Sequence, residues 1–194
     1  MQKPCEGHWS ATKRVLKYLK GIQDFGLKYT QVDDFNLIGY SDSYFDRDKE
    51  TGVSTSGYVM SLGSGVVSSG SCKQSIPVDS TTEAKYVAAT EAARKIVWLR
   101  KILEYLQEKQ MHSTPLLIDN TFAIKLENNP KFHNQKKHIN TKYHLILHHV
   151  EAKTIRLHHC STNEQIADIF TNALGRDKFE RFRMMLGLTN VPSD

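Results

Sequence analysis

Cysteine and long apolar runs are scarce in this sequence. Its three cysteines, Cys5, Cys72 and Cys160, are odd in number and far apart, which argues against a disulfide framework and a CxxC metal knuckle. The longest stretch without a charged residue, 51–72, consists mostly of Ser, Thr and Gly, so it is not a membrane span. The N-terminal residues lack the apolar segment of a secretory signal. We therefore expect an intracellular protein, in the cytoplasm or the nucleus, with reduced thiols and no membrane partner.

The composition is otherwise that of a folded domain, and its charge is unevenly distributed. The chain has 194 residues, of which 39% are hydrophobic and 24% charged, with a net charge of +5. Residues 131–159 are rich in Lys, Arg and His, whereas residues 31–50 hold six acids against two basic residues. The first region is suited to phosphate groups and the second to metal cations.

Hydrophobic periodicity predicts an α/β fold. Three strand-like runs precede a long amphipathic helix, and helices then alternate with two further strands. This order indicates a five-stranded mixed sheet flanked by helices, with three antiparallel strands followed by parallel ones. We expect the strands of the sheet at 35–45, 56–62, 66–73, 114–119 and 154–160, and a short appended strand at 25–29. We expect helices at 10–20, 81–107, 120–128, 137–152, 163–174 and 177–186.

Four acidic residues stand in apolar surroundings on four different elements. Asp42 lies within an apolar strand, and Asp119 ends the run Leu116–Ile118 at the position where α/β folds build their sites. Glu83 is in the first turn of the long helix, and Asp168 has mostly apolar neighbours. Clustered carboxylates require shared protons or cations, and all-oxygen ligands select Mg²⁺ or Mn²⁺. Each acid has a simpler explanation as a helix cap or a solvated side chain, and spacing alone does not join them.

Two other chemistries are weakly supported. His144 and His148 share a helix face, and His158, His159 and Cys160 follow, but their spacing matches no zinc signature. The hydroxyl-rich segment 68–71 contains no GxSxG motif and no ordered triad, which argues against a serine hydrolase.

The motifs resemble those of the ribonuclease H domain of copia-type LTR retrotransposon Pol polyproteins. The order and spacing agree from about residue 8 to 188. The segment 8–21, HWSATKRVLKYLKG, is similar to the connection that follows the polymerase in such polyproteins. The other matching motifs are GYSDSYF (39–45), STSGYV (54–59), KQS (73–75), STTEAKYVAATEAA (80–93), IDNTFAIKLENNPKFH (118–133), KHINTKYH (137–144), HCSTNEQIADIFTNAL (159–174) and RDKFERFRMMLGL (176–188).

The resemblance implies a ribonuclease H-like fold that cleaves the RNA strand of RNA–DNA hybrids by a two-metal-ion mechanism. It also implies that a reverse transcriptase domain is the partner in the parent polyprotein. The chain is expected to have two units: a connection-like helix and short strand at 1–30, and the ribonuclease H-like domain at 31–194. Carried over by motif, the catalytic residues that hold two Mg²⁺ or Mn²⁺ ions are Asp42, Glu83, Asp119 and Asp168. Candidate contacts to the nucleic-acid backbone are Lys131, Lys136, Lys137, Lys142 and Arg156.

Several positions depart from the family pattern, which leaves two other functions open. A non-catalytic nucleic-acid-binding module and a domesticated protein–protein adaptor both retain the fold without turnover. We expect Asp79 to be the damaging departure, in a space normally filled by an apolar side chain. We expect Lys85 to be a surface change, because it lies about 200° around the helix from Glu83. The remaining departures are Arg47, Ser69, Asn140 and Asn172.

Overall fold

Five strands form one mixed sheet in the order β4-β3-β2-β5-β6. The computed structural model describes residues 3–45, 53–119 and 145–191. The first three strands are antiparallel, whereas β5 is parallel to β2 and β6 is parallel to β5. The predicted five-stranded mixed sheet is therefore confirmed. The strands are β2 (Leu37–Tyr44), β3 (Thr55–Leu62), β4 (Gly65–Lys73), β5 (Thr114–Ile118) and β6 (Ile155–His159).

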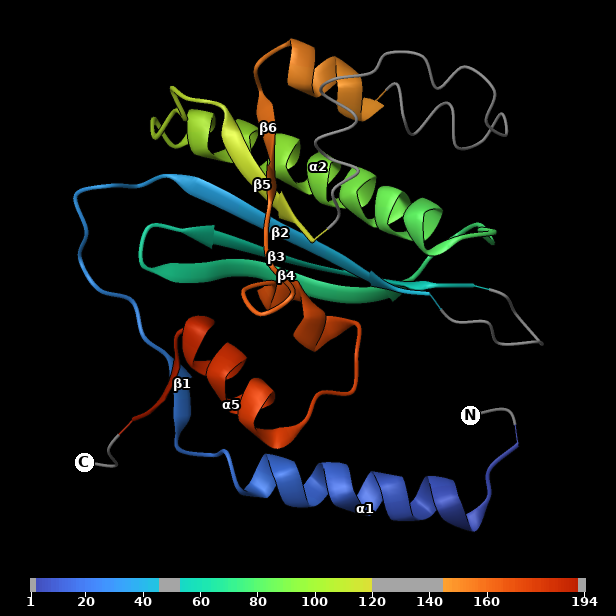
Figure 1. Cartoon of the computed structure of the whole chain (residues 1–194). Coiled ribbons are helices and arrows are strands. Elements are labelled where there is room, and N and C mark those ends of the chain that lie inside the picture. Colours follow the sequence, from blue (N-terminus) through green and yellow to red (C-terminus); the bar gives the residue numbers. More distant parts are fainter. Residues whose placement is uncertain (1–2, 46–52, 120–144, 192–194) are drawn as a thin grey trace.

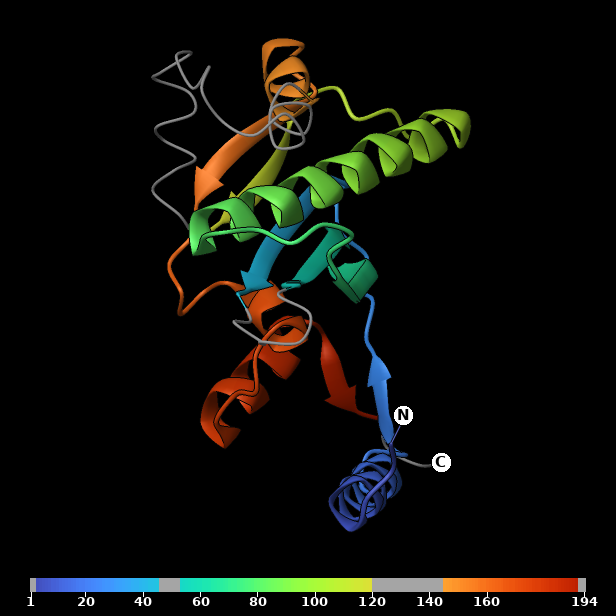
Figure 2. The ribbon, with the colours of Figure 1, turned by 90° about the vertical axis from the view of Figure 1, so that its right-hand side faces the viewer.

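Helices cover both faces of this sheet (Figures 1 and 2). The long helix α2 (Thr81–Tyr105) and the helical residues 145–151 lie on one face. The short 3₁₀ helix η1 (Ile166–Phe170) and α5 (Arg176–Met185) lie on the other. Each face has its own apolar core, one centred on Ile96 of α2 and the other on Phe182 of α5, and both side chains are fully buried.

Helix α2 is fixed to the sheet at its N-terminal end. The Ser80 hydroxyl accepts the N–H of Glu83 at 3.1 Å and so caps the helix. The buried Gln74 amide donates to the Ala84 carbonyl at 2.8 Å and to the Ser56 hydroxyl of β3 at 3.0 Å. These contacts set the rotation and position of α2 above the strand ends.

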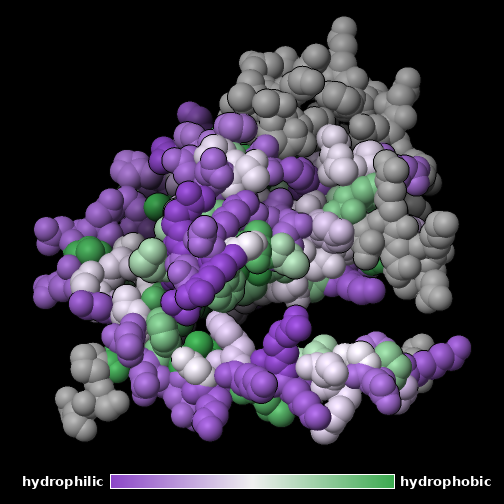
Figure 3. Space-filling view, turned by 60° about the horizontal axis from the view of Figure 1, so that its bottom comes forward, coloured by the Kyte–Doolittle hydropathy of each residue, from purple (hydrophilic) through white to green (hydrophobic). Residues whose placement is uncertain are grey.

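The first and last strands of the described residues form a separate ribbon. Strand β1 (Phe25–Leu27) pairs antiparallel with β7 (Leu188–Asn190). Helix α1 (Glu6–Lys20) has no buried residue. Figure 3 shows α1 standing off from the body over part of its length. The division expected at residue 30 stays a prediction, and β1 and β7 lie on opposite sides of it.

Two expectations need correction and others lie outside the described residues. The helix expected over 163–174 is only the five-residue η1, and β7 was not expected. The buried Gln165 side chain accepts the N–H of Ala167, so it starts the 3₁₀ turn, while the side chains after the turn bind a neighbouring strand. The expected helix 120–128, the first part of 137–152, Arg47 and Asn140 lie outside the described residues. In the described ranges no helix combines the length and apolar character needed to cross a membrane.

Candidate active site

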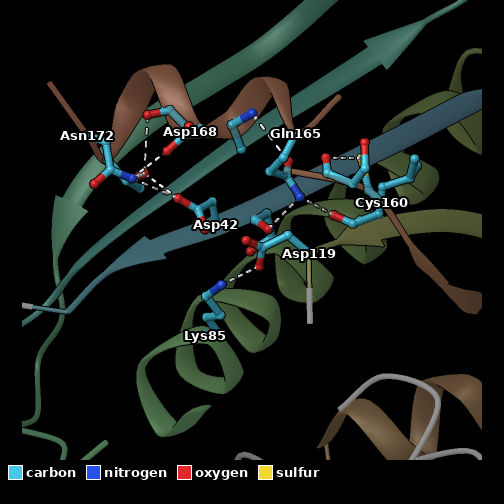
Figure 4. A network of polar contacts seen from close by, with 12 residues as sticks. Asp42, Lys85, Asp119, Cys160, Gln165, Asp168 and Asn172 are labelled. Carbon is cyan, nitrogen blue, oxygen red and sulfur yellow. Dashed lines mark hydrogen bonds and ion pairs between the residues drawn. The ribbon is translucent and has the colours of Figure 1, made fainter. Parts of the chain in front are cut away.

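Asp42 is the most buried of the predicted acids. It lies near the C-terminal end of β2 and is 5% exposed. Its Oδ2 atom accepts hydrogen bonds from the Thr171 hydroxyl and, at 3.4 Å, from the Asn172 amide, both just after η1 (Figure 4). Both donors are neutral, so they orient the carboxylate without neutralising its charge.

The approach of η1 to Asp42 depends on a glycine. Gly57 of β3 is the register partner of Asp42. A Cβ atom on Gly57 would lie 2.6 Å from Cγ2 of Thr171 and 2.9 Å from the carbonyl oxygen of Ala167. Any other residue at this position would therefore displace η1 and the donors that follow it.

The pKa of Asp42 is raised to about 6, mainly by burial; the nearby negative charge of Asp119 also raises this pKa, whereas the Thr171 hydrogen bond and the positive charge of Lys85 lower it. The Asp119 effect has a simple origin in the fold. Ser41 and Ile118 are paired in the parallel β2–β5 ladder, so the next residues, Asp42 and Asp119, lie at the same edge of the sheet. The raised pKa means that the site favours a proton or another cation beside Asp42.

Asp119 is held by Lys85 of α2. The Lys85 Nζ atom lies 2.5 Å from Oδ1 of Asp119, and the two side chains are 29% and 12% exposed. The expectation that Lys85 is a surface change is therefore wrong. Lys85 is on a different face of α2 from Glu83, as expected, but its face is the one turned toward the end of β5.

Asp168 lies in η1 and is linked to Asp42 by Asn172. The Asn172 amide donates to Oδ1 of Asp168 as well as to Oδ2 of Asp42. Lys178 of α5 places its Nζ atom 2.5 Å from Oδ2 of Asp168, which is 9% exposed. The structure thus brings Asp42, Asp119 and Asp168 to one region and gives two of them a lysine partner.

Glu83 is engaged elsewhere. Its Oε2 atom accepts the backbone N–H of Asp79 at 2.8 Å, so the carboxylate folds back over the N-terminus of its own helix. The Asp79 side chain is exposed, whereas its neighbour Val78 is buried. The expectation that Asp79 occupies an apolar space is therefore also wrong.

Gln165 joins the two strands that carry Asp42 and Asp119. It is 1% exposed, and its Nε2 atom donates to the carbonyl oxygens of Ser41 at 3.1 Å and Leu117 at 3.2 Å. This amide therefore fixes the spacing of β2 and β5 next to the acids. Sequence reasoning missed Gln165, Thr171 and Lys178, although the polar NEQ and FTN segments beside Asp168 were a usable signal.

The carboxylates have the chemistry that a hard divalent cation requires, but their present arrangement does not form a complete metal site. Oxygen ligands and a buried carboxylate with a raised pKa suit Mg²⁺ or Mn²⁺. Among the described residues, however, no group of three or more His, Cys, Asp or Glu side chains is arranged to hold a metal ion. The Lys85 and Lys178 ammonium groups each contact one oxygen of Asp119 and Asp168, so a metal ion at these carboxylates would have to displace the ammonium group or use the other oxygen beside a positive charge.

Of the remaining candidates, the structure describes Arg156 and the cysteines. Arg156 is exposed near the start of β6, whereas the β6 residue level with Ile118 is His159. Lys131, Lys136, Lys137 and Lys142 lie outside the described residues, as does His144. All three cysteines are free thiols. The pKa of Cys160 is raised to about 11, mainly by burial, so this thiol is protonated at neutral pH.

Known proteins resemble this chain in sequence and in fold. It is 36% identical over 192 residues to the retrovirus-related Pol polyprotein from transposon RE2 of Arabidopsis thaliana, covering 99% of this chain and 13% of that polyprotein. It is 46% identical over 96 residues to secreted RxLR effector protein 161 of Plasmopara viticola, covering 50% of this chain and 68% of that protein. No protein-family model matches the chain.

The fold is that of ribonuclease H. The N-terminal RNase H domain of rv2228c from Mycobacterium tuberculosis superposes with a TM-score of 0.51 at 12% identity, over 78% of this chain and 98% of that structure. The predicted ribonuclease H-like fold is therefore confirmed.

Proposed function

Because the chain belongs to the retrotransposon Pol polyproteins, of which it is the ribonuclease H domain, we propose that it hydrolyses the RNA strand of RNA–DNA hybrids. The observation that carries the proposal is the convergence of Asp42, Asp119 and Asp168 at the C-terminal edge of β2 and β5. These acids would hold two divalent cations, and Glu83 would join them after releasing the Asp79 N–H. Such ions, when bound, activate water and stabilise the departing 3′-oxygen.

The chain's own residues prepare this edge for the reaction. Thr171 and Asn172 hold the Asp42 carboxylate in one orientation, and Asn172 also fixes Asp168. Gln165 keeps β2 and β5 in register beside the acids. Fixed donors of this kind reduce the reorganisation that the reaction requires.

We propose that the substrate is bound mainly through its phosphates. The candidates are those of the basic segment, Lys131, Lys136, Lys137, Lys142 and Arg156. Phosphate contacts give affinity without sequence specificity, and 2′-hydroxyl groups distinguish the RNA strand.

We also propose that a reverse transcriptase domain is the partner in the parent polyprotein, where α1 is available for contact. The apolar side chains Trp9, Leu16 and Leu19 of α1 are 61%, 59% and 52% exposed. Residues 1–30 would then act as the connection, and residues 31–194 as the catalytic domain.

A cleavage assay tests the proposed reaction. The substrate is an RNA–DNA hybrid labelled on the RNA strand, incubated with Mg²⁺ or Mn²⁺ and, separately, with EDTA. We expect metal-dependent cleavage that Asp42→Asn abolishes and Asp33→Asn, at an exposed loop position, preserves. Equal cleavage by Asp42→Asn and the unaltered protein would refute the assignment.

A second function is a nucleic-acid-binding module without turnover. The observation that favours it is the engagement of three acids by the chain itself, Asp119 by Lys85, Asp168 by Lys178 and Glu83 by the Asp79 N–H. Under this alternative the protein binds hybrid with an affinity that falls steeply with salt, but leaves the RNA intact. Absence of both cleavage and binding would instead favour the protein–protein adaptor.

A further inference from the structure

The contact between Lys85 and Asp119 is the feature of the site that goes furthest beyond the proposed reaction. The Lys85 ammonium group is 2.5 Å from Oδ1 of Asp119 and is only partly exposed. It reaches the carboxylate from α2, whose position is fixed independently by Gln74 and Ser80. The contact is therefore built into the packing of the helix, and Figure 4 shows it at the edge of the acidic group.

The charge balance explains what this contact does. Ionised Asp42, Asp119 and Asp168 carry three negative charges, and Lys85 and Lys178 supply two positive charges in direct contact with two of them. A divalent cation approaching these carboxylates meets a group that is already largely neutralised. Even at the oxygen that the lysine leaves open, the cation would lie close to a positive charge in a partly buried site, which is costly.

The two lysines differ in how firmly they are held. The Nζ atom of Lys178 contacts Asp168 and also lies 5.2 Å from the centre of the Phe182 ring. Asp168 has the Asn172 amide as a second donor. Asp119 lies at the end of β5, beside the Asp42 carboxylate whose pKa its charge affects. Loss of Lys85 would therefore increase the negative charge where two acids on adjacent strands meet.

We propose that Lys85 is an internal competitor of the divalent cation, so that metal binds more weakly while the ammonium group contacts Asp119. This inference rests on the proposed function, because it takes Asp119 to be a metal ligand. Lys85 is then a residue that sets metal affinity, and it does not touch the reacting atoms. Its removal should tighten metal binding even though it removes a stabilising ion pair from the metal-free protein.

Binding of Mn²⁺ to the full chain, measured by isothermal titration calorimetry, tests this inference without any use of activity. Lys85→Met keeps the length of the aliphatic side chain and removes the charge. The matched control is Lys95→Met on the same helix, whose ammonium group lies over the rings of Trp98 and Tyr58 at 4.7 and 5.7 Å. We expect at least a tenfold lower Kd for Lys85→Met and an unchanged Kd for Lys95→Met. Lys85→Gln provides the same test if the methionine variant does not fold.

The outcomes separate the inference from the proposed function. Equal Mn²⁺ affinity in Lys85→Met and the unaltered protein, with binding abolished by Asp119→Asn, would overturn the inference and leave the metal site in place. Absence of Mn²⁺ binding in every variant, or binding that survives both Asp42→Asn and Asp119→Asn, would overturn the proposed function as well. A thermal melt adds an independent check, since we expect Lys85→Met to melt lower in EDTA and to gain more from Mn²⁺ than the unaltered protein does.

Discussion

Replacing Asp42 by Asn should stabilise the metal-free protein at neutral pH. The pKa of Asp42 is about 6 in the folded protein, against 3.8 for an ordinary aspartate. A difference of about two pH units corresponds to about 3 kcal/mol, at about 1.4 kcal/mol per unit. Asn carries no charge and keeps an oxygen that can accept the Thr171 hydrogen bond, so we expect a gain of about 1–3 kcal/mol at pH 7.5.

The pH dependence of this gain has a definite sign. A raised pKa in the folded state means that the folded protein binds the proton more tightly than the unfolded chain does. The wild type therefore loses stability as the pH rises from about 3.8 to about 6, and the full loss is present above that range. The advantage of Asp42→Asn should be greatest above pH 6 and should vanish below about pH 4.

Urea denaturation in EDTA at several pH values between 4 and 7.5 measures this difference. Asp33→Asn, at an exposed position, serves as the control and should change the free energy of unfolding little at any pH. An Asp42→Asn protein that is less stable than the wild type at pH 7.5, or whose advantage does not vary with pH, would refute the reasoning. Such a result would mean that the charge of Asp42 is compensated within the folded chain.

Three further predictions concern packing, hydrogen bonding and thiol chemistry. Gly57→Ala should lower the free energy of unfolding in urea by about 1–3 kcal/mol, because the added methyl group overlaps Thr171. Gly175→Ala should have little effect, because its added methyl group would meet no atom within 4 Å. An equal loss of stability in both variants would contradict the close approach of η1. Gln165→Leu should cost about 1–3 kcal/mol in the same assay by leaving buried carbonyl oxygens without their donor, whereas Gln31→Leu at an exposed position should not. N-ethylmaleimide at pH 8, followed by mass spectrometry, should label exposed Cys5 and Cys72 well before buried Cys160; early labelling of Cys160 would show that β6 opens readily.

The sequence was a good guide to the sheet and a weaker guide to the site. Alternation and turn residues located all five main strands to within about two residues, because burial on one or both faces fixes the pattern of a strand. The placement of Asp42 and Asp119 at one edge was expected only from the family resemblance, because spacing alone did not join the two acids. Helix 163–174 was overestimated because local side-chain contacts, such as that of Gln165, compete with the helical backbone and leave no periodic signal.

Lys85 shows why contacts at the site were harder to predict. The angle between Lys85 and Glu83 around the helix follows from helical geometry and was correct. Which of the two faces turns toward β5 depends on the rotation of α2 about its axis. That rotation is set by buried contacts such as Gln74 to Ala84, between residues whose partners are not evident from the chain alone.

The ribbon formed by β1 and β7 determines how the domain would respond to tension. Phe25 is paired with Asn190, so the chain enters and leaves the folded body at one end of the same ribbon. A force applied to both ends would open this antiparallel pair one hydrogen bond at a time, like a zipper, and would leave the five-stranded sheet unloaded until the ribbon had separated. The flanking chain could thus be pulled or cleaved close to the domain while Asp42 and Asp119 kept their places.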